Sequence, residues 1–358
     1  MNEGITQFNE TMAKYLAKDR RYFLSHPAHI RMLAKVSRNI RRQAKVRGKL
    51  QEKENLVVPP VLILSVTNEC NLSCAGCYAH SQQRDAAEEM SIDDIRRTVD
   101  EAVALGVCVV LVAGGEPLMK EGLLDIPQKH PGTLFVMFTN GLLLTSETLY
   151  RMQRMKNLIP VISLEGDEAA TDARRGKGMY RAVMQIMNRL NERRSLFGAS
   201  ITITSSNFDD VISAAYMDDL KSAGCRIVFL IEYVPTDDND FDLCLTDAQK
   251  KRLIAQTEKL IEAHDMLVVP LPGDEDKYGG CLAAGRGFLH ISSTGSLEAC
   301  PFAPFADTNV QKMPLKNALQ SKLLREIRDN HHLLRESRGG CALQENQDWV
   351  KSLMREEL

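Results

Sequence analysis

The chain has 358 residues, of which 44% are apolar and 26% charged, and its formal net charge at pH 7 is −2. No apolar stretch is long enough to span a membrane as a helix, so the composition excludes an integral membrane protein of that type and predicts a large buried core. Nine cysteines in a long chain with a polar N-terminus predict reduced thiols and metal ligation in the cytoplasm, and they argue against a secreted disulfide framework.

The first predicted element is a basic helical extension over residues 1–56. From Lys14 to Lys53 it carries thirteen Lys or Arg and two acids, a net charge of +11, which leaves −13 for the rest of the chain. Two interpretations stay open: a solvated helix packed on an acidic barrel, or a surface for an acidic partner such as a phosphorylated substrate, anionic lipid or nucleic acid. The spacing predicts one apolar face on this helix, formed by Ile30, Leu33, Ala34, Ile40 and Ala44.

A buried strand is predicted over residues 61–66, and it leads into a loop with three cysteines. Cys70, Cys74 and Cys77 follow a Cys-x₃-Cys-x₂-Cys spacing. Reactive groups in α/β proteins usually lie on loops at the carboxyl ends of parallel strands. Three thiolates fill three of the four ligand positions of a [4Fe–4S] cluster and leave one iron open. Two alternatives remain, a Cys₃His zinc site that includes His80 and three unligated core thiols.

This loop resembles the signature of the radical S-adenosylmethionine (radical SAM) superfamily, in which the same spacing follows the first barrel strand. The family usually has an aromatic residue just before the last cysteine, whereas this chain has Gly76 there and Tyr78 directly afterwards. The resemblance implies an enzyme whose open iron binds S-adenosylmethionine. Reductive cleavage then gives methionine and a 5′-deoxyadenosyl radical, which abstracts hydrogen from a substrate. It also implies an electron donor such as flavodoxin or ferredoxin.

Five further strands are predicted over residues 107–113, 134–138, 158–162, 200–204 and 225–231, with helices over 92–104 and 180–196 between them. Taken alone, the Gly-Gly-Glu-Pro turn after the second strand is an ordinary strand–turn–helix junction. Arg174 can equally be a solvent-exposed arginine with no ligand, and Asn207 can equally be the N-cap of the next helix. The family resemblance implies cofactor-binding roles for Tyr78, Gly114, Gly115, Glu116, Asn140, Ser163, Glu165, Arg174 and Asn207.

Six strand–helix pairs between residues 61 and 264 predict an α/β fold, because repeated units of this kind form a parallel sheet with right-handed crossovers. Six pairs fall short of the eight of a closed barrel. The predicted architecture is therefore a partial (β/α)6 TIM-like open barrel over residues 57–266, which is also the architecture of the family. A small C-terminal α+β domain is predicted over residues 267–358.

The C-terminal segment contains a second set of cysteines. Two short strands around a Thr-Gly turn are predicted near residues 288–300. Cys281, the Gly295-x₄-Cys300 step and Cys341 resemble the twitch module, a shortened SPASM extension, which implies a second [4Fe–4S] cluster. Cys244, a substrate group or another side chain is a candidate fourth ligand. Two more thiols, Cys108 and Cys225, lie inside apolar strands and are predicted to be buried and structural.

The predicted function is therefore that of a radical SAM enzyme with an auxiliary cluster, acting on a peptide or protein side chain. The alternative within the same chemistry is a step on a small molecule in cofactor or natural-product biosynthesis. The alternative from another class is a non-catalytic iron–sulfur or zinc-binding protein with an electron-transfer or structural role.

Overall fold

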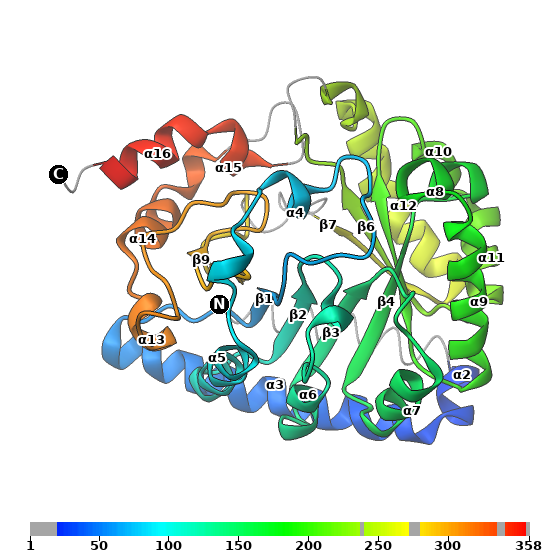
Figure 1. The fold of residues 1–358 in the computed structure, drawn as a ribbon, viewed down its shortest axis with the longest axis horizontal. Helices are drawn as coiled ribbons and strands as arrows, with labels where there is room; N and C mark the ends of the chain where they lie inside the picture. Colours follow the sequence, from blue (N-terminus) through cyan, green and yellow to red (C-terminus); the bar gives the residue numbers. More distant parts are fainter. Residues whose placement is uncertain (1–19, 237–239, 272–279, 335–340, 356–358) are drawn as a thin grey trace.

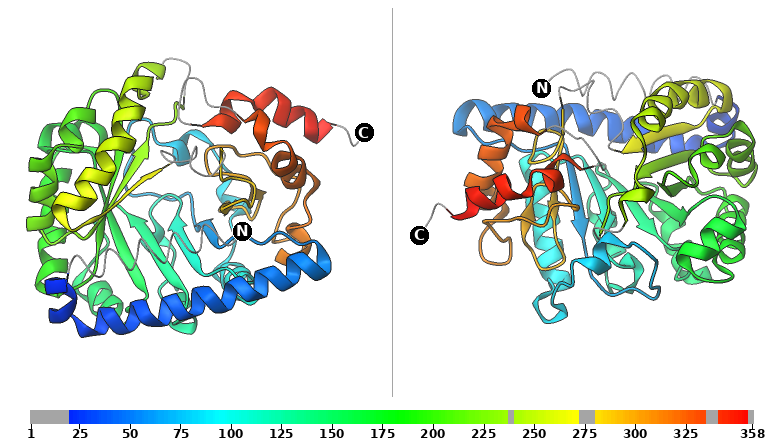
Figure 2. Two further views of the ribbon diagram at one scale, coloured as in Figure 1. Left: turned by 180° about the vertical axis from the view of Figure 1, so that it is seen from behind. Right: turned by 90° about the horizontal axis from the view of Figure 1, so that it is seen from above.

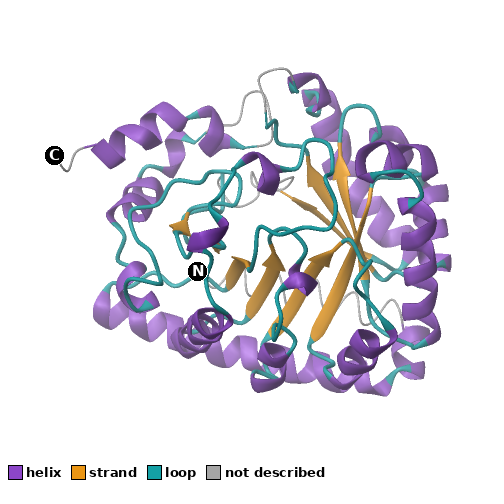
Figure 3. Ribbon diagram, in the orientation of Figure 1, coloured by secondary structure: helices purple, strands orange, loops and turns teal. Residues whose placement is uncertain are grey.

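The computed structural model describes residues 20–236, 240–271, 280–334 and 341–355. These residues form a nine-stranded sheet that curls into a half-barrel with helices around it (Figure 1, Figure 3). The strand order is β7-β6-β5-β4-β3-β2-β1-β8-β9, and every neighbouring pair except β8–β9 is parallel. The strands are β1 Val61–Ser65, β2 Val109–Ala113, β3 Leu134–Thr139, β4 Leu158–Leu164, β5 Gly198–Ile203, β6 Ile227–Glu232, β7 Leu267–Leu271, β8 Phe288–Ile291 and β9 Leu297–Glu298.

Helices follow most of these strands, and the predicted partial barrel is confirmed. Ser91 caps the helix that was predicted over 92–104, because its side chain and that of Asp94 form a reciprocal capping box at the start of the observed helix over 92–105. The helices are α2 Arg20–Ser25, α3 Pro27–Glu54, α4 Tyr78–Ser81, α5 Ile92–Leu105, α6 Asp125–Lys129, α7 Ser146–Arg154, α8 Glu168–Arg175, α9 Met179–Glu192, α10 Phe208–Val211, α11 Ala214–Ser222, α12 Asp247–His264, α13 Leu315–Ala318, α14 Lys322–Asp329, α15 Ala342–Glu345 and α16 Gln347–Arg355.

The sheet extends further than predicted at both ends. Strand β7 was not expected from the sequence, and it adds a parallel neighbour to β6. The predicted hairpin near residues 288–300 is present as β8 and β9, but β8 also pairs with β1 in parallel. The C-terminal hairpin is therefore continuous with the barrel sheet, directly beside the strand that leads into the cysteine loop. The predicted domain boundary at residue 267 stays a prediction.

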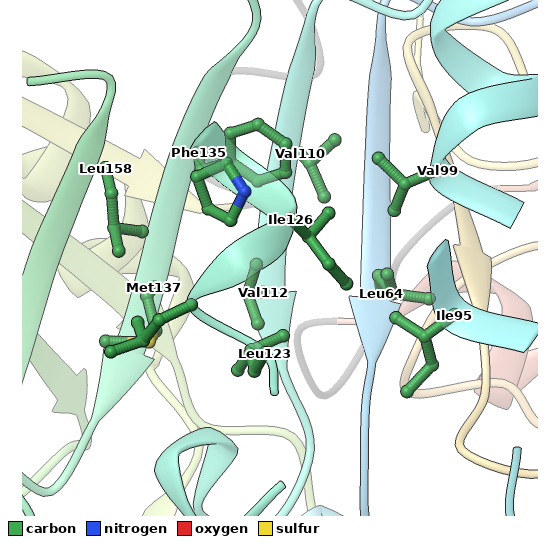
Figure 4. Close-up of a pocket in the computed structure, with 12 residues that line it drawn as sticks. Leu64, Ile95, Val99, Val110, Val112, Leu123, Ile126, Phe135, Met137 and Leu158 are labelled. Carbon is green, nitrogen blue, oxygen red and sulfur yellow. The ribbon is translucent and has the colours of Figure 1, made fainter. Parts of the chain in front are cut away.

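The outer face of the sheet packs against α5 and α6. Leu64 of β1 and Val110 and Val112 of β2 lie opposite Ile95 and Val99 of α5 (Figure 4). The cavity between them has a volume of about 10 Å³ and an apolar lining. This volume is at the lower limit for a single water molecule, so the space belongs to the core and has no room for a ligand.

The long helix α3 crosses the amino ends of the strands, on the opposite side of the sheet from the cysteine loop (Figure 1, Figure 2). The predicted apolar face is only partly right, since Ile30 and Ala34 are exposed. The face that packs on the barrel is rotated toward residues that include four polar side chains. It is formed by His29, Met32, Leu33, Val36, Asn39, Ile40, Gln43 and Arg47.

Hydrogen bonds explain why two of these polar residues, Gln43 and Arg47, are buried. Gln43 donates to the carbonyl of Val103 (3.0 Å) and Arg47 donates to the carbonyl of Gly106 (2.5 Å), both near the C-terminus of α5. The final carbonyls of a helix lack partners within the helix, and donors from elsewhere satisfy them. These contacts fasten α3 to the barrel.

A buried histidine in the first turns of α3 predicts a pH-dependent stability. Burial, followed by the charges of Lys156 and His26, lowers the pKa of His29 to about 4. An unfolded chain protonates this group near its ordinary value of about 6.5. Below that pH the unfolded state binds more protons, so the free energy of unfolding falls as the pH drops from about 6.5 to 4, by at most about 1.4 kcal/mol per pH unit. His29→Gln is expected to reduce this slope in urea titrations at several pH values.

The control for this experiment is His332→Gln, which changes an exposed histidine in the C-terminal part of the chain. A slope that is equally steep in the parent and in His29→Gln would contradict the prediction.

Within the described ranges, no helix has the length and apolar character needed to cross a membrane.

Candidate cofactor and iron–sulfur site

The three-cysteine loop lies over the carboxyl ends of the barrel strands. It leaves β1, crosses toward the β6 side of the sheet and returns to α4 (Figure 1). Parallel strands direct all their carboxyl ends to one edge, so the turns after β2 to β5 face the same loop. The predicted site residues therefore come from separate strands but meet at a single edge of the sheet.

The start of the loop is fixed by backbone contacts with the Gly-Gly turn. The amide of Gly115 donates to the carbonyl of Thr67 (2.7 Å), and the amide of Glu116 donates to the carbonyl of Glu69 (2.8 Å). A Cβ at Gly114 or Gly115 would overlap these loop carbonyls. Glycine is required here because the two backbones approach closely.

A carboxylate that the sequence analysis missed also holds the start of the loop. Glu89 accepts from the hydroxyl of Thr67 (2.9 Å) and from the amide of Asn68 (2.6 Å), and Lys120 lies 3.5 Å from it. Glu89 belongs to no motif in the sequence. Its importance follows from a contact across twenty-one residues, for which the local pattern contains no signal.

The far end of the loop is held by Arg174 of α8. This side chain donates to the carbonyls of Ala75 (3.1 Å) and Gly76 (3.3 Å), while the amide of Ala75 donates to the carbonyl of Arg174 (2.9 Å). Arg174 also donates to Glu165 (2.7 Å) and to the hydroxyl of Thr202 (2.6 Å). One guanidinium therefore joins the loop to the ends of β4 and β5.

Tyr233, just after β6, explains why glycine replaces the usual aromatic residue in the loop. A Cβ on Gly76 would lie 2.6 Å from the Tyr233 hydroxyl, and the Gly76 φ of +60° is a conformation that side chains disfavour. The aromatic ring near Gly76 thus comes from another strand. The hydroxyl of Tyr233 is fixed in turn by Asp240, at 2.9 Å.

Gly76→Ala is expected to destabilise the loop for two separable reasons, the steric overlap and the positive φ. The φ term is about 1–2 kcal/mol. Lower iron binding after anaerobic reconstitution should reveal the change, and adding Tyr233→Phe should restore part of it by removing the nearest atom. Gly178→Ala is the control, since Gly178 has a φ of +85° but no atom within 4 Å of an added Cβ. Equal iron loss in both single variants would contradict the steric part.

The three thiols fit a cluster site by their chemistry and surroundings. Cys70, Cys74 and Cys77 are free, half-buried and close enough for their charges to act on one another. Burial raises the pKa of Cys70 and of Cys74, so binding iron there would displace protons. The side-chain nitrogen of Asn68, beside the loop, is buried without an acceptor among the described residues. A cluster sulfur is a suitable acceptor for it.

The geometry differs from that of a site for one ion. In the described part of the chain, no group of three or more His, Cys, Asp or Glu side chains is arranged around a single metal ion. The ligands of a cube each bind a different iron, so they stand farther apart than the ligands of one ion. His80, the fourth ligand of the zinc alternative, is exposed on α4.

Most of the predicted cofactor residues are hydrogen bonded within the chain. Glu116, which is 1% exposed, accepts from the hydroxyl of Thr139 (2.7 Å) and the amide of Asn140 (2.8 Å), and burial raises its pKa. The Asn140 side chain donates to Asn71 in the cysteine loop (2.7 Å). Both residues therefore support the loop from beneath.

The remaining predicted residues divide into a hydrogen-bonded group and two residues, Ser163 and Tyr78, whose side chains make no hydrogen bond with the described residues. Glu165 contacts both Arg174 and Arg175 and accepts from the amide of Thr202 (3.1 Å). Asn207 donates to the carbonyls of Glu165 and Thr202, both at 3.0 Å, and does not cap α10. Ser163 of β4 is half-buried and has no side-chain hydrogen bond within the described residues. The cofactor-binding roles of all these residues stay predictions.

The second set of cysteines also comes together. Cys281, Cys300 and Cys341 are each less than 10% exposed and free of disulfides. A hydrogen bond with Cys341, then burial and the charges of Cys341 and Cys281, raise the pKa of Cys300. Three residues separated by up to sixty positions therefore share one buried site.

The other three cysteines are also buried. Cys244 follows a short 3-10 helix that is bonded to the end of β5, through the Ser205 amide and the Leu243 carbonyl (2.9 Å). Its role as a fourth cluster ligand stays a prediction. Cys108 and Cys225 are buried as predicted, and burial raises the pKa of both.

Comparisons with known proteins agree with this geometry. Residues 64–215 match the model of the Radical SAM superfamily. The chain therefore contains a radical SAM domain. Its radical SAM domain contains the cysteine loop, the Gly-Gly turn and the α8 arginines. The family expectation and the expectation of an enzyme are confirmed, and the family implies S-adenosylmethionine and a [4Fe–4S] cluster.

Relatives extend the likeness beyond this domain. The chain is 24% identical over 315 residues to the AdoMet-dependent heme synthase of Methanosarcina barkeri, covering 80% of this chain and 88% of the relative. It is 28% identical over 309 residues to the mycofactocin maturase MftC of Mycolicibacterium smegmatis, with coverages of 82% and 77%. The solved structure of Streptococcus suis SuiB bound to S-adenosylmethionine shares the fold, with a TM-score of 0.65, 18% identity and coverages of 83% and 73%.

Proposed function

We propose that this radical SAM enzyme holds its catalytic [4Fe–4S] cluster on Cys70, Cys74 and Cys77 and modifies a peptide or protein side chain. The observation that carries the proposal is the position of three free thiols on one braced loop, over the carboxyl ends of the strands, inside the segment that matches the family. When bound, the cluster and S-adenosylmethionine supply a 5′-deoxyadenosyl radical that abstracts hydrogen from the substrate.

The residues of the chain position these groups. Glu89 and Arg174 fix the two ends of the loop, and Asn140 supports its middle through Asn71. Ser163 of β4, whose hydroxyl makes no hydrogen bond with the described residues, is proposed to contact the cofactor. Such a site needs a one-electron donor, for which flavodoxin and ferredoxin are the candidates, and a reducing compartment such as the cytoplasm.

An auxiliary [4Fe–4S] cluster on Cys281, Cys300 and Cys341 is the second part of the proposal. It is supported by the gathering of the three thiols in one buried site. Replacing all three with alanine is expected to lower the iron from roughly eight to roughly four per chain and to leave some cleavage of S-adenosylmethionine. Iron analysis after anaerobic reconstitution checks this. Unchanged iron in the triple variant would remove the auxiliary cluster from the proposal.

The substrate class is supported by relatives. SuiB, whose fold this chain shares, has been solved bound to the precursor peptide SuiA. A second candidate, a step on a small molecule, is favoured by the heme synthase relative, which aligns with 80% of this chain. Both use the same radical chemistry and differ in what must reach the open face of the half-barrel.

The experiment that tests the function is anaerobic reconstitution with S-adenosylmethionine and dithionite. Formation of 5′-deoxyadenosine supports the enzyme, and its absence from a chain with full iron loading supports a non-catalytic iron–sulfur protein. Deuterated candidate substrates then separate the two classes. Deuterium carried into 5′-deoxyadenosine from a peptide favours peptide modification, and label carried from a tetrapyrrole favours the small-molecule step.

The basic surface of α3 lies far from the cysteine loop, which limits how a partner bound there could act on the site. Its exposed lysines and arginines lie at the amino ends of the strands, away from the cysteine loop (Figure 1). A partner bound there would not be delivered directly to the site, so contact with an acidic partner stays a prediction. The exposed basic residues are Arg31, Lys35, Arg38, Arg41, Arg42, Lys45, Lys49 and Lys53.

A further inference from the structure

A series of buried polar side chains joins the end of β1, the C-terminal hairpin and the segment after α4. The hydroxyl of Ser65, the last residue of β1, lies 2.8 Å from Nε2 of His290 on β8. Nδ1 of His290 lies 2.8 Å from Glu298 on β9. Glu298 in turn makes two contacts with Arg84, at 2.7 and 2.9 Å. The segment after α4 is thus linked to β1 through the C-terminal hairpin.

Both ends of this series, Ser65 and Arg84, flank the three-cysteine loop, and its interior member Glu298 adjoins Cys300. Ser65 precedes Cys70 by five residues, and Glu298 precedes Cys300 by two. Gln82, which accepts from Arg84, donates to the carbonyl of Pro301 at 2.7 Å.

A ring contact runs alongside these polar contacts. Tyr78, directly after Cys77, packs its ring against Phe302, with the centroids 4.9 Å apart. The residues after the catalytic cysteines and those around Cys300 therefore form one continuous contact.

These four side chains include an ion pair that is almost completely buried, which is unusual for a contact with only a structural role. His290 and the side chain of Glu298 are each 1% exposed, and the Arg84 side chain is 12% exposed. Buried ion pairs are often no more stabilising than apolar packing of the same volume, but removing one partner strands the other charge. Here the network holds the segment after α4 against the C-terminal hairpin.

We propose that the Ser65–His290–Glu298–Arg84 chain couples the two cysteine sites, so that assembly at either one stabilises the other, with His290 as the central positioning residue. The proposal rests on the two-site function proposed above. It concerns residues that touch neither set of cysteines directly in the contacts described, so it can be tested in the chain without iron as well as in the loaded enzyme.

The first test uses the iron-free chain and hydrogen exchange read by mass spectrometry. His290→Ala is expected to speed amide exchange about fivefold or more in both residues 66–77 and residues 299–305, and to leave strands β3 to β5 unchanged. Glu298→Gln, which keeps the shape of the side chain, is the second variant and should act in the same direction. Exchange that changes only in the hairpin would overturn the proposal. Because no iron is present, this result does not depend on whether the proposed function is correct.

The matched control is His264→Ala, which removes another buried histidine paired with a carboxylate, Asp218, at 2.9 Å. It lies at the end of α12, away from both cysteine sets, and should leave both segments unchanged.

The second test is a double-mutant cycle in the reconstituted enzyme. It compares the parent, His290→Ala, the triple variant Cys281→Ala, Cys300→Ala and Cys341→Ala, and all four changes together. The measurement is the half-life of the catalytic cluster's electron paramagnetic resonance signal in the presence of a chelator.

His290→Ala and the triple cysteine variant should each shorten that half-life. The variant with all four changes should have the same half-life as the triple variant, because the triple variant has already lost the coupling. Multiplicative effects would contradict coupling between the sites. A chain that gives no such signal in any variant would contradict the proposed function and would leave the hydrogen-exchange result to decide the coupling.

Discussion

Cys74→Ala is expected to abolish 5′-deoxyadenosine formation and to remove about half of the iron, roughly four of eight atoms per chain. Cys74 lies in the middle of the loop, with the positive charges of Arg175 and Arg174 acting on its thiol. The proposed cluster would have only three ligands from the protein, so losing one would leave two irons without a protein thiolate. Iron analysis and chromatography of reaction products, both under anaerobic conditions, measure the two effects.

The control for this prediction is Cys225→Ala. Cys225 is fully buried, and its thiol donates to the carbonyl of Ile227 (3.1 Å) at the start of β6. This variant loses a thiol from the core and should keep the parent iron content and product yield. A Cys74→Ala chain that still cleaves S-adenosylmethionine would refute the assignment of the loop. A colourless parent chain that binds zinc tightly would do the same.

Most of the barrel could be predicted because strands buried on both faces form continuous apolar runs. Strand β7 could not, because Pro270 interrupts a short run, and proline cannot donate to a neighbouring strand. The structure resolves this conflict by placing β7 at the edge of the sheet, where β6 is its one neighbour among the described strands. Which strand lies at an edge depends on the whole sheet, so the local sequence pattern does not reveal it.

The buried face of α3 was predicted only in part for a similar reason. A search for apolar periodicity favours Ile30 and Ala34, whereas the structure buries Gln43 and Arg47. Polar side chains can be buried when hydrogen-bond partners are available. Here the partners are carbonyls at the end of α5, about sixty residues away in sequence. The helix itself was predictable, but its rotation depended on these distant contacts.

The cysteines of the candidate site could be predicted from spacing, but the bracing of the loop could not. Arg174 was expected to contact the cofactor, and the structure gives it contacts with loop carbonyls ninety-nine and ninety-eight residues away. Tyr233 and Glu89 belong to no sequence motif, and each contacts the cysteine loop rather than carrying chemistry itself. The sequence therefore identifies the groups that carry chemistry more readily than the groups that position them.

The position of Arg174 leads to the second prediction with a large effect. Arg174→Ala is expected to lower the rate of 5′-deoxyadenosine formation roughly a hundredfold. Two charge-assisted hydrogen bonds to the loop carbonyls are lost, and a value of about 1.5 kcal/mol for each corresponds to that factor. The barrel should remain folded, since Glu165 keeps its contact with Arg175 and the carbonyl of residue 174 still accepts from Ala75.

Two further variants separate positioning from general damage. Arg174→Lys keeps the charge near Glu165 but cannot reach both carbonyls with one planar group, so its rate should fall between those of the parent and of Arg174→Ala. Arg181→Ala removes an exposed arginine paired with Glu168 at 2.9 Å and should behave as the parent. If Arg174→Ala lost iron to a chelator no faster than Arg181→Ala, the arginine would not hold the loop. A slower rate would then have to come from direct contact with the cofactor, as the family resemblance alone implies.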